Sequence, residues 1–176
     1  MIRGERTHLL PLDPDNIEIV RAWINDPDIN EWMLSGHAPV TRAQERRWYE
    51  LIDASDTDHV FEIHIAENAE LIGLCGLHKI DPLHRHAELG IFIGTAEEQG
   101  KGYGSDALMT ATRFGFQTLG LHTIRIGYID GNERGAALYP SLGFKPAGRL
   151  RDHIYLRGAF HDLVLLDMTR EEFDAR

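Results

Sequence analysis

The pattern of apolar and polar residues predicts a chain in which strands and helices are interleaved. Period-two alternation and short apolar runs indicate strands, whereas apolar residues spaced three and four apart indicate helices. Strands are predicted for residues 7–12, 60–66, 71–80, 86–93, 123–129, 145–157 and 159–168, and helices for 13–24, 41–54, 105–119 and 133–142. The resulting order, β-α-α-β-β-β-α-β-α-β-β, indicates one mixed α/β (α+β) domain with an antiparallel centre.

Turn and capping residues support these boundaries. Asp13-Pro14-Asp15 has the composition of a helix start, and Asp26-Pro27-Asp28 breaks the helix that follows. Thr41, with Gln44 three residues later, has the sequence of a capping box, in which each side chain bonds the other residue's backbone N–H. Arg157-Gly158 separates the last two strands and predicts a hairpin turn.

The composition is that of an ordinary globular domain. The chain has 176 residues, of which 43% are hydrophobic and 26% are charged. Cys75 is the only cysteine, so no disulfide can form within the chain. No stretch approaches the roughly 18 apolar residues of a membrane span, and Met1 to Arg6 is not followed by the apolar run of a signal peptide. We therefore expect a cytoplasmic protein that does not associate with membranes.

The net charge of −10 is distributed unevenly. Residues 1–88 carry 17 acids and 8 Lys or Arg, a net charge of −9, whereas residues 89–176 carry 11 acids and 10 Lys or Arg, a net charge of −1. An acidic chain is a poor candidate for binding nucleic acid, whose phosphates require a basic surface. The acidic first half could attract a cationic ligand, or it could serve solubility alone.

A glycine-rich segment lies between a predicted strand and a predicted helix. Its sequence is Gln99-Gly100-Lys101-Gly102-Tyr103-Gly104. Glycines there let the backbone turn its N–H groups toward an anion, and the start of the following helix adds its dipole and unpaired donors. The segment therefore predicts a phosphate or pyrophosphate site, with a plain tight turn as the alternative.

Two common nucleotide-binding motifs do not fit this segment. A P-loop requires four residues between its first glycine and Gly-Lys-Ser/Thr, but five residues separate Gly94 from Gly100, and Gly102 stands where the hydroxyl should be. A dinucleotide fingerprint requires Gly-x-Gly-x-x-Gly after an early parallel strand. Here the glycines occupy positions 100, 102 and 104, late in the chain.

Gln99, Gly102 and Gly104 form the pattern Gln-x-x-Gly-x-Gly, which resembles the pyrophosphate loop of the GNAT superfamily of N-acetyltransferases. The resemblance extends over nearly the whole chain and is strongest in residues 86–168. Further matching segments are Glu88 to Ile93, Asn132, Leu138-Tyr139, Gly143-Phe144 and, for the RimJ/RimL-like branch, Gly148 to Arg151 with Gly158 and Asp162. That branch acetylates protein N-termini and includes spermidine acetyltransferases.

The resemblance implies a single GNAT domain over residues 1–176, with a mixed, mostly antiparallel sheet of about seven strands, flanked by helices and splayed between its fourth and fifth strands. Residues 1 to about 85 would form the acceptor side, and about 86–168 would bind acetyl-CoA. The implied reaction is direct acetyl transfer to a primary amine in a ternary complex, without a metal. The acceptor would be a protein N-terminus or a small cationic amine such as a polyamine. A homodimer and a non-catalytic CoA-binding sensor remain alternatives.

The resemblance also assigns roles to individual residues. Tyr139 would donate a proton to the departing CoA thiolate, and Glu88 would accept one from the amine, directly or through water. The alternative structural roles are a packed aromatic side chain for Tyr139 and, for Glu88, a surface carboxylate paired with Arg85 or Lys79. The expected cofactor-binding residues are Ile91, Phe92, Ile93, Gln99, Gly100, Lys101, Gly102, Tyr103, Gly104, Ser105 and Asn132. A backbone N–H near Ile91 would meet the oxyanion, and Asn132 could instead cap a helix.

Two features depart from the family pattern. The turn at residues 94–98 is one residue longer than is common and lacks a proline. Pro140 directly follows Tyr139, and a proline inside a helix favours a kink, which affects the direction in which Tyr139 points.

Acidic residues between the first two helices, Asp26, Asp28 and Glu31, are expected at the acceptor entrance, where they would attract a protonated amine.

Other residues are given structural interpretations. His84 and His86 could form a metal pair, but no third ligand has a suitable spacing, so no metal is expected. Cys75 lies in an apolar strand and is expected in the core. Trp23, Trp32 and Trp48 are expected mainly to pack, although their region lines the acceptor site in the family.

Overall fold

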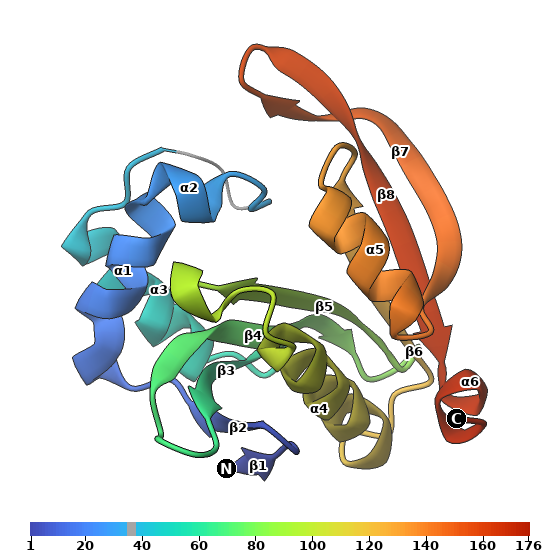
Figure 1. Ribbon diagram of the computed structural model, residues 1–176. Helices are drawn as coiled ribbons and strands as arrows, with labels where there is room; N and C mark the ends of the chain where they lie inside the picture. Colours follow the sequence, from blue (N-terminus) through green and yellow to red (C-terminus); the bar gives the residue numbers. More distant parts are fainter. Residues whose placement is uncertain (35–37) are drawn as a thin grey trace.

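The centre of the protein is one open sheet of eight strands. We describe it from a computed structural model that covers residues 1–34 and 38–176. The strand order is β1-β2-β3-β4-β5-β6-β8-β7 (Figure 1). The strands are β1 (Ile2–Arg3), β2 (Thr7–Pro11), β3 (His59–Ile65), β4 (Leu71–Asp81), β5 (His86–Ile93), β6 (Thr123–Ile129), β7 (Lys145–Leu156) and β8 (Ala159–Thr169).

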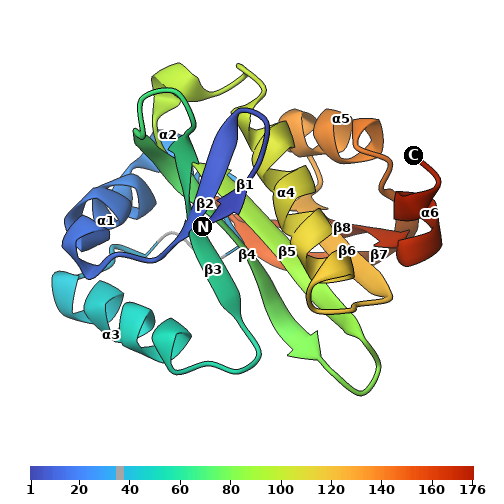
Figure 2. The ribbon, with the colours of Figure 1, turned by 90° about the horizontal axis from the view of Figure 1, so that it is seen from below.

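Helices cover both faces of this sheet. They are α1 (Ile17–Asn25), α2 (Pro27–Asn30), α3 (Arg42–Asp53), α4 (Tyr103–Gln117), α5 (Glu133–Ser141) and α6 (Arg170–Asp174), with 3-10 turns at Pro14–Asn16 and Ala96–Glu98. In Figure 2, α1 and α3 lie on one side of the strands and α4 lies on the other. The predicted mixed fold with a mostly antiparallel sheet is therefore confirmed.

The sheet opens between β5 and β6, its only parallel pair among the described residues. The pairing runs from His86 with Thr123 to Leu89 with Ile126 and extends no further. Beyond it, β5 continues to pair with β4, and β6 continues to pair with β8. The strands therefore separate from Gly90 and Gly127 onward, which is the predicted splay.

Two apolar clusters hold the layers together. The larger joins α4, α5 and α6 to one face of the sheet and includes Leu77, Leu89, Phe116 and Ile126, all almost fully buried. The smaller joins α1 and α3 to the opposite face and includes Val20, with Phe92 packed against it. Strand alternation explains the division, because Leu89 and Phe92 lie on opposite faces of β5.

Several helix boundaries follow the capping chemistry expected from the sequence. Thr41 and Gln44 make both bonds of the predicted capping box, and the Asp13 carboxylate accepts the N–H of Asp15. The chain begins α4 at Tyr103, two residues earlier than predicted, because Gly102 adopts a left-handed φ of 90° as its N-cap. Since glycine alone enters this region freely, the loop ends there and the helix begins immediately.

Three short elements were not predicted. The two-residue β1 pairs with β2 and raises the strand count from about seven to eight. The single turn of α2 follows the Asp26-Pro27-Asp28 segment, and α6 begins at a second capping box, formed by Thr169 and Glu172. None of the helices described is both long enough and apolar enough to cross a membrane.

Candidate functional site

The glycine-rich loop has left-handed backbone at two positions, with φ of 76° at Gly100 and 90° at Gly102. A Cβ at Gly100 would meet no heavy atom within 4 Å, so the space beside the turn is open. The first N–H groups of α4, from Tyr103 onward, have no acceptor one turn earlier in the helix and face this space with the positive end of its dipole. The residues present therefore fit a phosphate or pyrophosphate group.

Side chains from three directions fix the loop in position. The Gln99 Nε2 donates to the carbonyl of Ile93, 3.0 Å away, which joins the loop to the end of β5. Arg134 at the start of α5 donates to Oε1 of the same glutamine. Arg6 donates to the Lys101 carbonyl and stacks over the Tyr103 ring, with 4.6 Å between its Cζ and the ring centroid. Arg6 thus places a cation beside the loop.

A carboxylate in the first turn of α4 joins the helix to the N-terminal strands. Asp106 accepts the backbone N–H groups of Glu5, Arg6 and Thr7 and the Thr7 hydroxyl, at 2.6–3.1 Å. Burial raises the pKa of Asp106, but these hydrogen bonds outweigh burial and leave its pKa below the usual value. No local pattern in the sequence points to Arg6 or Asp106, because about 100 residues separate the partners.

Tyr139 lies on α5, on the same face of the sheet as α4. Its side chain is 9% exposed and belongs to the larger apolar cluster, with its ring 6.1 Å from that of Tyr128. Burial raises the pKa of Tyr139 to about 12. The helix continues through Pro140 to Ser141. The Asn132 side chain caps this helix by accepting the N–H of Gly135 at 3.1 Å, which is the alternative role considered for it.

Glu88 lies on the opposite face of β5 and is held between two cations. Its carboxylate contacts Lys79 Nζ at 3.0 Å and accepts a hydrogen bond from Arg125, its partner across the parallel pair. Burial raises the pKa of Glu88, but the hydrogen bonds and charges of Lys79 and Arg125 prevail and lower its pKa. These contacts weaken the carboxylate as a proton acceptor.

A second acid–base pair lies on the same face, one strand away. His78 on β4 contacts Asp58 with 3.0 Å between Nδ1 and Oδ1. The other oxygen of Asp58 accepts the hydroxyls of Ser55 at 2.8 Å and Thr57 at 3.1 Å. Burial raises the pKa of Asp58, while the bonds from Ser55, His78 and Thr57 lower it and prevail. Sequence reasoning missed this pair, since nothing in the local pattern joins residues 58 and 78.

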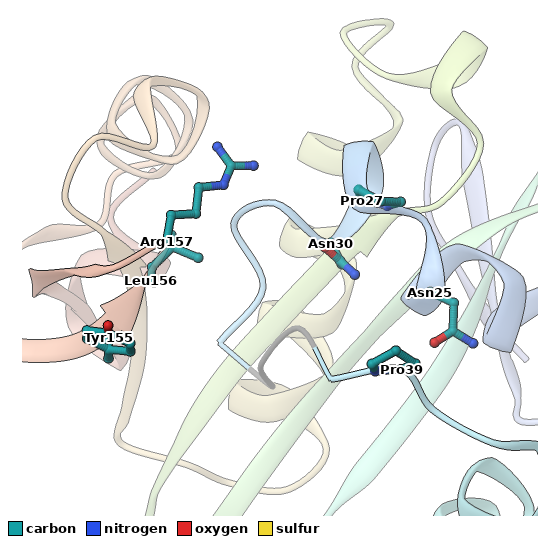
Figure 3. A pocket seen from close by; sticks show the side chains of 7 residues that line it. All are labelled: Asn25, Pro27, Asn30, Pro39, Tyr155, Leu156 and Arg157. Atoms are coloured by element: carbon teal, nitrogen blue, oxygen red, sulfur yellow. The ribbon is translucent and has the colours of Figure 1, made fainter.

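A pocket of about 580 Å³ lies between the α1–α2 region and the tip of the β7–β8 hairpin. Figure 3 shows the residues that line it: Asn25, Pro27, Asn30, Pro39, Tyr155, Leu156 and Arg157. Arg157 Nη1 contacts Glu31 Oε1 at 2.8 Å, so an ion pair joins the hairpin to the α2 region. Among the described residues that line the pocket there is no carboxylate.

Two of the three acidic residues expected at the acceptor entrance have side-chain partners within the protein. Asp26 caps α2, with its Oδ1 accepting the N–H of Asp28 at 2.9 Å, and Glu31 pairs with Arg157.

Trp23 on α1 packs edge-on against Phe92, with 6.3 Å between ring centroids. This contact places α1 directly over a β5 residue that was expected to contact the cofactor.

The remaining candidates have structural surroundings. Trp32 lies against Gly131, where an added Cβ would be 3.2 Å from Cη2 of the indole, and Trp48 packs edge-on against Tyr49. Cys75 is 2% exposed, and burial raises the pKa of its thiol. His84 and His86 stack with their rings 6.3 Å apart. In residues 1–34 and 38–176, no three His, Cys, Asp or Glu side chains are grouped to hold a metal ion.

Comparison with known families and proteins identifies similar sequences. A family profile described as an acetyltransferase (GNAT) domain matches residues 6–145. A spermidine N(1)-acetyltransferase of Vibrio cholerae is 32% identical over 136 residues, covering 71% of this chain and 77% of that protein. A putative ribosomal N-acetyltransferase of Bacillus subtilis is 32% identical over 113 residues, covering 64% of this chain and 61% of that protein.

Solved structures share the fold. A crystal structure of spermidine N-acetyltransferase from Vibrio cholerae, in complex with CoA and spermine, superimposes with a TM-score of 0.89 and 23% sequence identity. The match covers 97% of this chain and 99% of that one. The arrangement of strands, splay and helices described above is therefore common to both proteins.

Proposed function

The chain belongs to the acetyltransferase (GNAT) family, and from this premise we propose that it acetylates the N-terminal amine of a peptide or protein. Family membership makes it an acetyl-CoA-dependent N-acetyltransferase of the branch that includes spermidine and ribosomal-protein enzymes. A non-catalytic CoA-binding sensor is accordingly not the interpretation we adopt. The acceptor, the cofactor contacts and the roles of individual residues form the proposal.

The pyrophosphate of acetyl-CoA would bind at the loop of residues 99–104 and the first turn of α4. Open space beside Gly100, free N–H groups at the helix start and the Arg6 guanidinium support this placement. The pantetheine arm would pair with β5 from Gly90 to Ile93, where β6 no longer pairs with it. Ile91, Phe92 and Ile93 keep their expected role, and Asn132 contributes by fixing the start of α5.

The two substrates would meet through the splay from opposite faces of the sheet. The loop, α4 and Tyr139 lie on one face, whereas Glu88, Gly90 and Phe92 lie on the other, below α1. The amine nitrogen attacks the thioester carbonyl, the carbon–sulfur bond breaks, and the thiolate takes a proton from the Tyr139 hydroxyl. A pKa of about 12 keeps that hydroxyl protonated at neutral pH, so it can act as the donor.

The lining of the pocket at the hairpin tip is the observation that favours a peptide acceptor. Its described residues are amides, prolines, a leucine, a tyrosine and one arginine. A polyamine carries several cations that require carboxylates, whereas the first residues of a peptide carry one cation and several amide groups. Asn25 and Asn30 keep the walls in place through bonds to the Val40 and Ile24 backbone, leaving Tyr155 and Arg157 to contact the acceptor.

A panel of amines tests the proposal through release of CoA thiol. Peptides with different uncharged first residues are compared with spermidine and spermine at equal concentrations. Each peptide is paired with an Nα-acetylated copy of the same sequence, which removes the N-terminal amine and keeps any lysine. We expect kcat/KM for the best free peptide to exceed that for either polyamine by about tenfold or more, and the blocked copies to be inactive.

The opposite ranking would overturn the choice of acceptor. Turnover of spermidine above all free peptides would assign the pocket to a polyamine. Equal turnover of free and blocked peptides would place the acetyl group on a side chain.

A further inference from the structure

The pair formed by His78 and Asp58 has the geometry of an oriented base. Because the Asp58 carboxylate accepts at Oδ1, the Nδ1 of His78 carries the proton in the neutral ring. Nε2 then has its lone pair available. Asp58 is itself fixed by Ser55 and Thr57, so the ring has a defined direction.

The position of Nε2 follows from the glycines around it. His78 is directly opposite Glu88 across the β4–β5 ladder, and Gly76 is opposite Gly90. A Cβ added at Gly76 would lie 3.1 Å from Nε2, and one at Gly90 would lie 3.7 Å from it. The ring therefore extends over two glycines toward Gly90, the first residue of β5 after its pairing with β6 ends.

An irregularity in β4 supports this placement. The register between β4 and β5 shifts between His78 and Asp81, and Lys79 adopts a positive φ of 50°. A non-glycine residue in that region is uncommon, and β-bulges often redirect side chains next to active sites. Here the bulge immediately follows the histidine, whose side chain remains 34% exposed and accessible to a substrate.

We propose that His78 is the general base of the acetyl transfer, accepting a proton from the acceptor ammonium at Nε2, with Asp58 as its positioning residue. The inference rests on the proposed function only in requiring a protonated amine, whether a peptide N-terminus or a polyamine. It assigns Glu88 to a structural role, because Lys79 and Arg125 already neutralise that carboxylate.

The proton balance is complete with groups that the reaction supplies. The ammonium gives one proton to Nε2, which releases it to solvent, and the neutral nitrogen attacks the carbonyl carbon. When the tetrahedral intermediate collapses, the carbon–sulfur bond breaks and the thiolate takes the Tyr139 proton. The nitrogen then loses its second proton, which restores the tyrosine hydroxyl. The products are the amide, CoA thiol and one released proton.

The charged groups around the ring come from β4 itself and from three neighbouring parts of the chain, namely the segment before β3, β5 and β6. Asp58 approaches from the segment before β3, and Glu88 lies opposite on β5 with Lys79 and Arg125 beside it. The positive charges beside Glu88 offset its effect on the imidazole.

The test compares His78→Gln, Asp58→Asn and Glu88→Gln across pH, using the most active amine from the panel. His84→Gln serves as the matched control, since His84 lies in the exposed turn between β4 and β5. At pH about 7 we expect kcat/KM for the amine to fall about 100-fold in His78→Gln, which is typical of a lost general base. The deficit should shrink as pH passes the pKa of the acceptor amine, about 8 for an α-amine and about 10 for an alkylamine such as a polyamine, because the amine is then already mostly neutral.

The other variants sharpen the assignment. Asp58→Asn should lower kcat/KM for the amine about tenfold, with the same recovery at high pH. The KM for acetyl-CoA should stay unchanged in both variants. A merely structural role for His78 would give a deficit that is constant with pH. The inference is overturned if the loss of kcat/KM in His78→Gln is constant with pH or smaller than twofold. It is also overturned if Glu88→Gln alone shows the pH-dependent loss.

Folding of the variants and the choice of acceptor are measured independently of the pH dependence of kcat/KM. Thermal unfolding and acetyl-CoA titration establish that each variant is folded, and Asp58→Asn provides a second route if His78→Gln does not fold. A polyamine as the best acceptor would refute the proposed peptide function and leave the variant pattern intact. A flat pattern in the variants would refute the base and leave the ranking of amines intact.

Discussion

On the proposed function, the two faces of the splayed strands recognise their substrates by different means. On the cofactor side, formed by residues 99–104, α4 and α5, the groups that fit the ligand are mainly backbone N–H groups and a helix dipole. On the acceptor side, formed by the pocket at the hairpin tip and the His78–Asp58 pair, they are side chains from distant parts of the chain.

This difference determines what substitution can change. A backbone site depends on which residues can adopt its φ angles, so glycine is the critical residue type. A side-chain site depends on tertiary contacts, so its specificity can change while the fold is retained. The relatives illustrate the point, since proteins named for spermidine and for ribosomal substrates are similar to the same chain.

Replacing Gly102 should have the largest effect, because it disrupts the backbone site itself. A valine there must adopt a φ of 90°, and its Cβ would lie 2.8 Å from Arg6 Nη1. We expect Gly102→Val to weaken CoA binding by about 100-fold or more, equivalent to at least about 2.7 kcal/mol. Isothermal titration calorimetry with CoA measures this change.

Gly120→Val provides the matched control. Gly120 also has a positive φ, of 69°, but lies beyond α4, away from the loop. It should lose stability through the same backbone strain and bind CoA normally. An unchanged CoA affinity in folded Gly102→Val would show that the pyrophosphate binds elsewhere.

Replacing Tyr139 tests the chemistry on the cofactor side. Tyr139→Phe should lower kcat about 100-fold and leave the KM for acetyl-CoA nearly unchanged, since the ring stays and only the proton donor is lost. Tyr128→Phe, whose ring is 6.1 Å away, is the control. Because burial raises the pKa of Tyr139 to about 12, its ionisation should cause no loss of kcat between pH 7 and 10. An alkaline decline near pH 9 that disappears in the phenylalanine variant would contradict this.

The Asp106 carboxylate tests how the cofactor side is joined to the N-terminal strands. Asp106→Asn should destabilise the fold by about 2 kcal/mol, because partly buried N–H groups lose a charged acceptor. Its folded pKa is lowered, so the stabilisation is present above the ordinary value of 3.8 and is lost as pH falls through the lower folded pKa. Urea unfolding should therefore show the difference between variant and wild type shrinking in acid.

The control for this experiment is Asp174→Asn. Asp174 forms an exposed pair with Arg170 at 2.7 Å, worth less than about 0.5 kcal/mol. If Asp106→Asn and Asp174→Asn lose equal amounts of stability, Asp106 is another surface charge rather than the junction between α4 and the N-terminal strands.

The sequence carries a stronger local signal for the loop of residues 99–104 than for the acceptor side, for the same physical reason. The loop depends on glycines within six residues and on the helix that follows, so its features are local. Even the error in the start of α4 was local, since the left-handed Gly102 ended the loop earlier than expected. The residue roles assigned there, including those of Lys101 and Ser105, stay predictions.

The acceptor side has no comparable local signal. Asp58 and His78 meet because β3 and β4 pair with His59 opposite Leu77, and Arg157 meets Glu31 from 126 residues away. The acidic first half suggested capture of a cation, yet Asp26 caps α2, Glu31 pairs with Arg157, and the described pocket lining holds no carboxylate. Net charge therefore could not reveal which carboxylates are available to a ligand.

Removing the ion pair between Glu31 and Arg157 should have the smallest effect of these substitutions. The direction in which the KM for the acceptor changes nevertheless distinguishes a peptide from a polyamine. Arg157 is well exposed and Glu31 is partly exposed, so Arg157→Gln should change the free energy of unfolding by less than about 1 kcal/mol. It should raise the KM for a peptide acceptor about threefold, because the hairpin tip loses its contact with the α2 region, while Arg151→Gln, on β7 of the same hairpin, should not. A polyamine should respond in the opposite direction, since a repelling cation is removed from the pocket. Salt extends the comparison, because raising ionic strength from about 0.1 M to 1 M shortens the screening length from about 10 Å to 3 Å. A peptide bound through amides should show little change in kcat/KM, and a steep loss with salt in both wild type and Arg157→Gln would show that the acidic surface captures a cation after all.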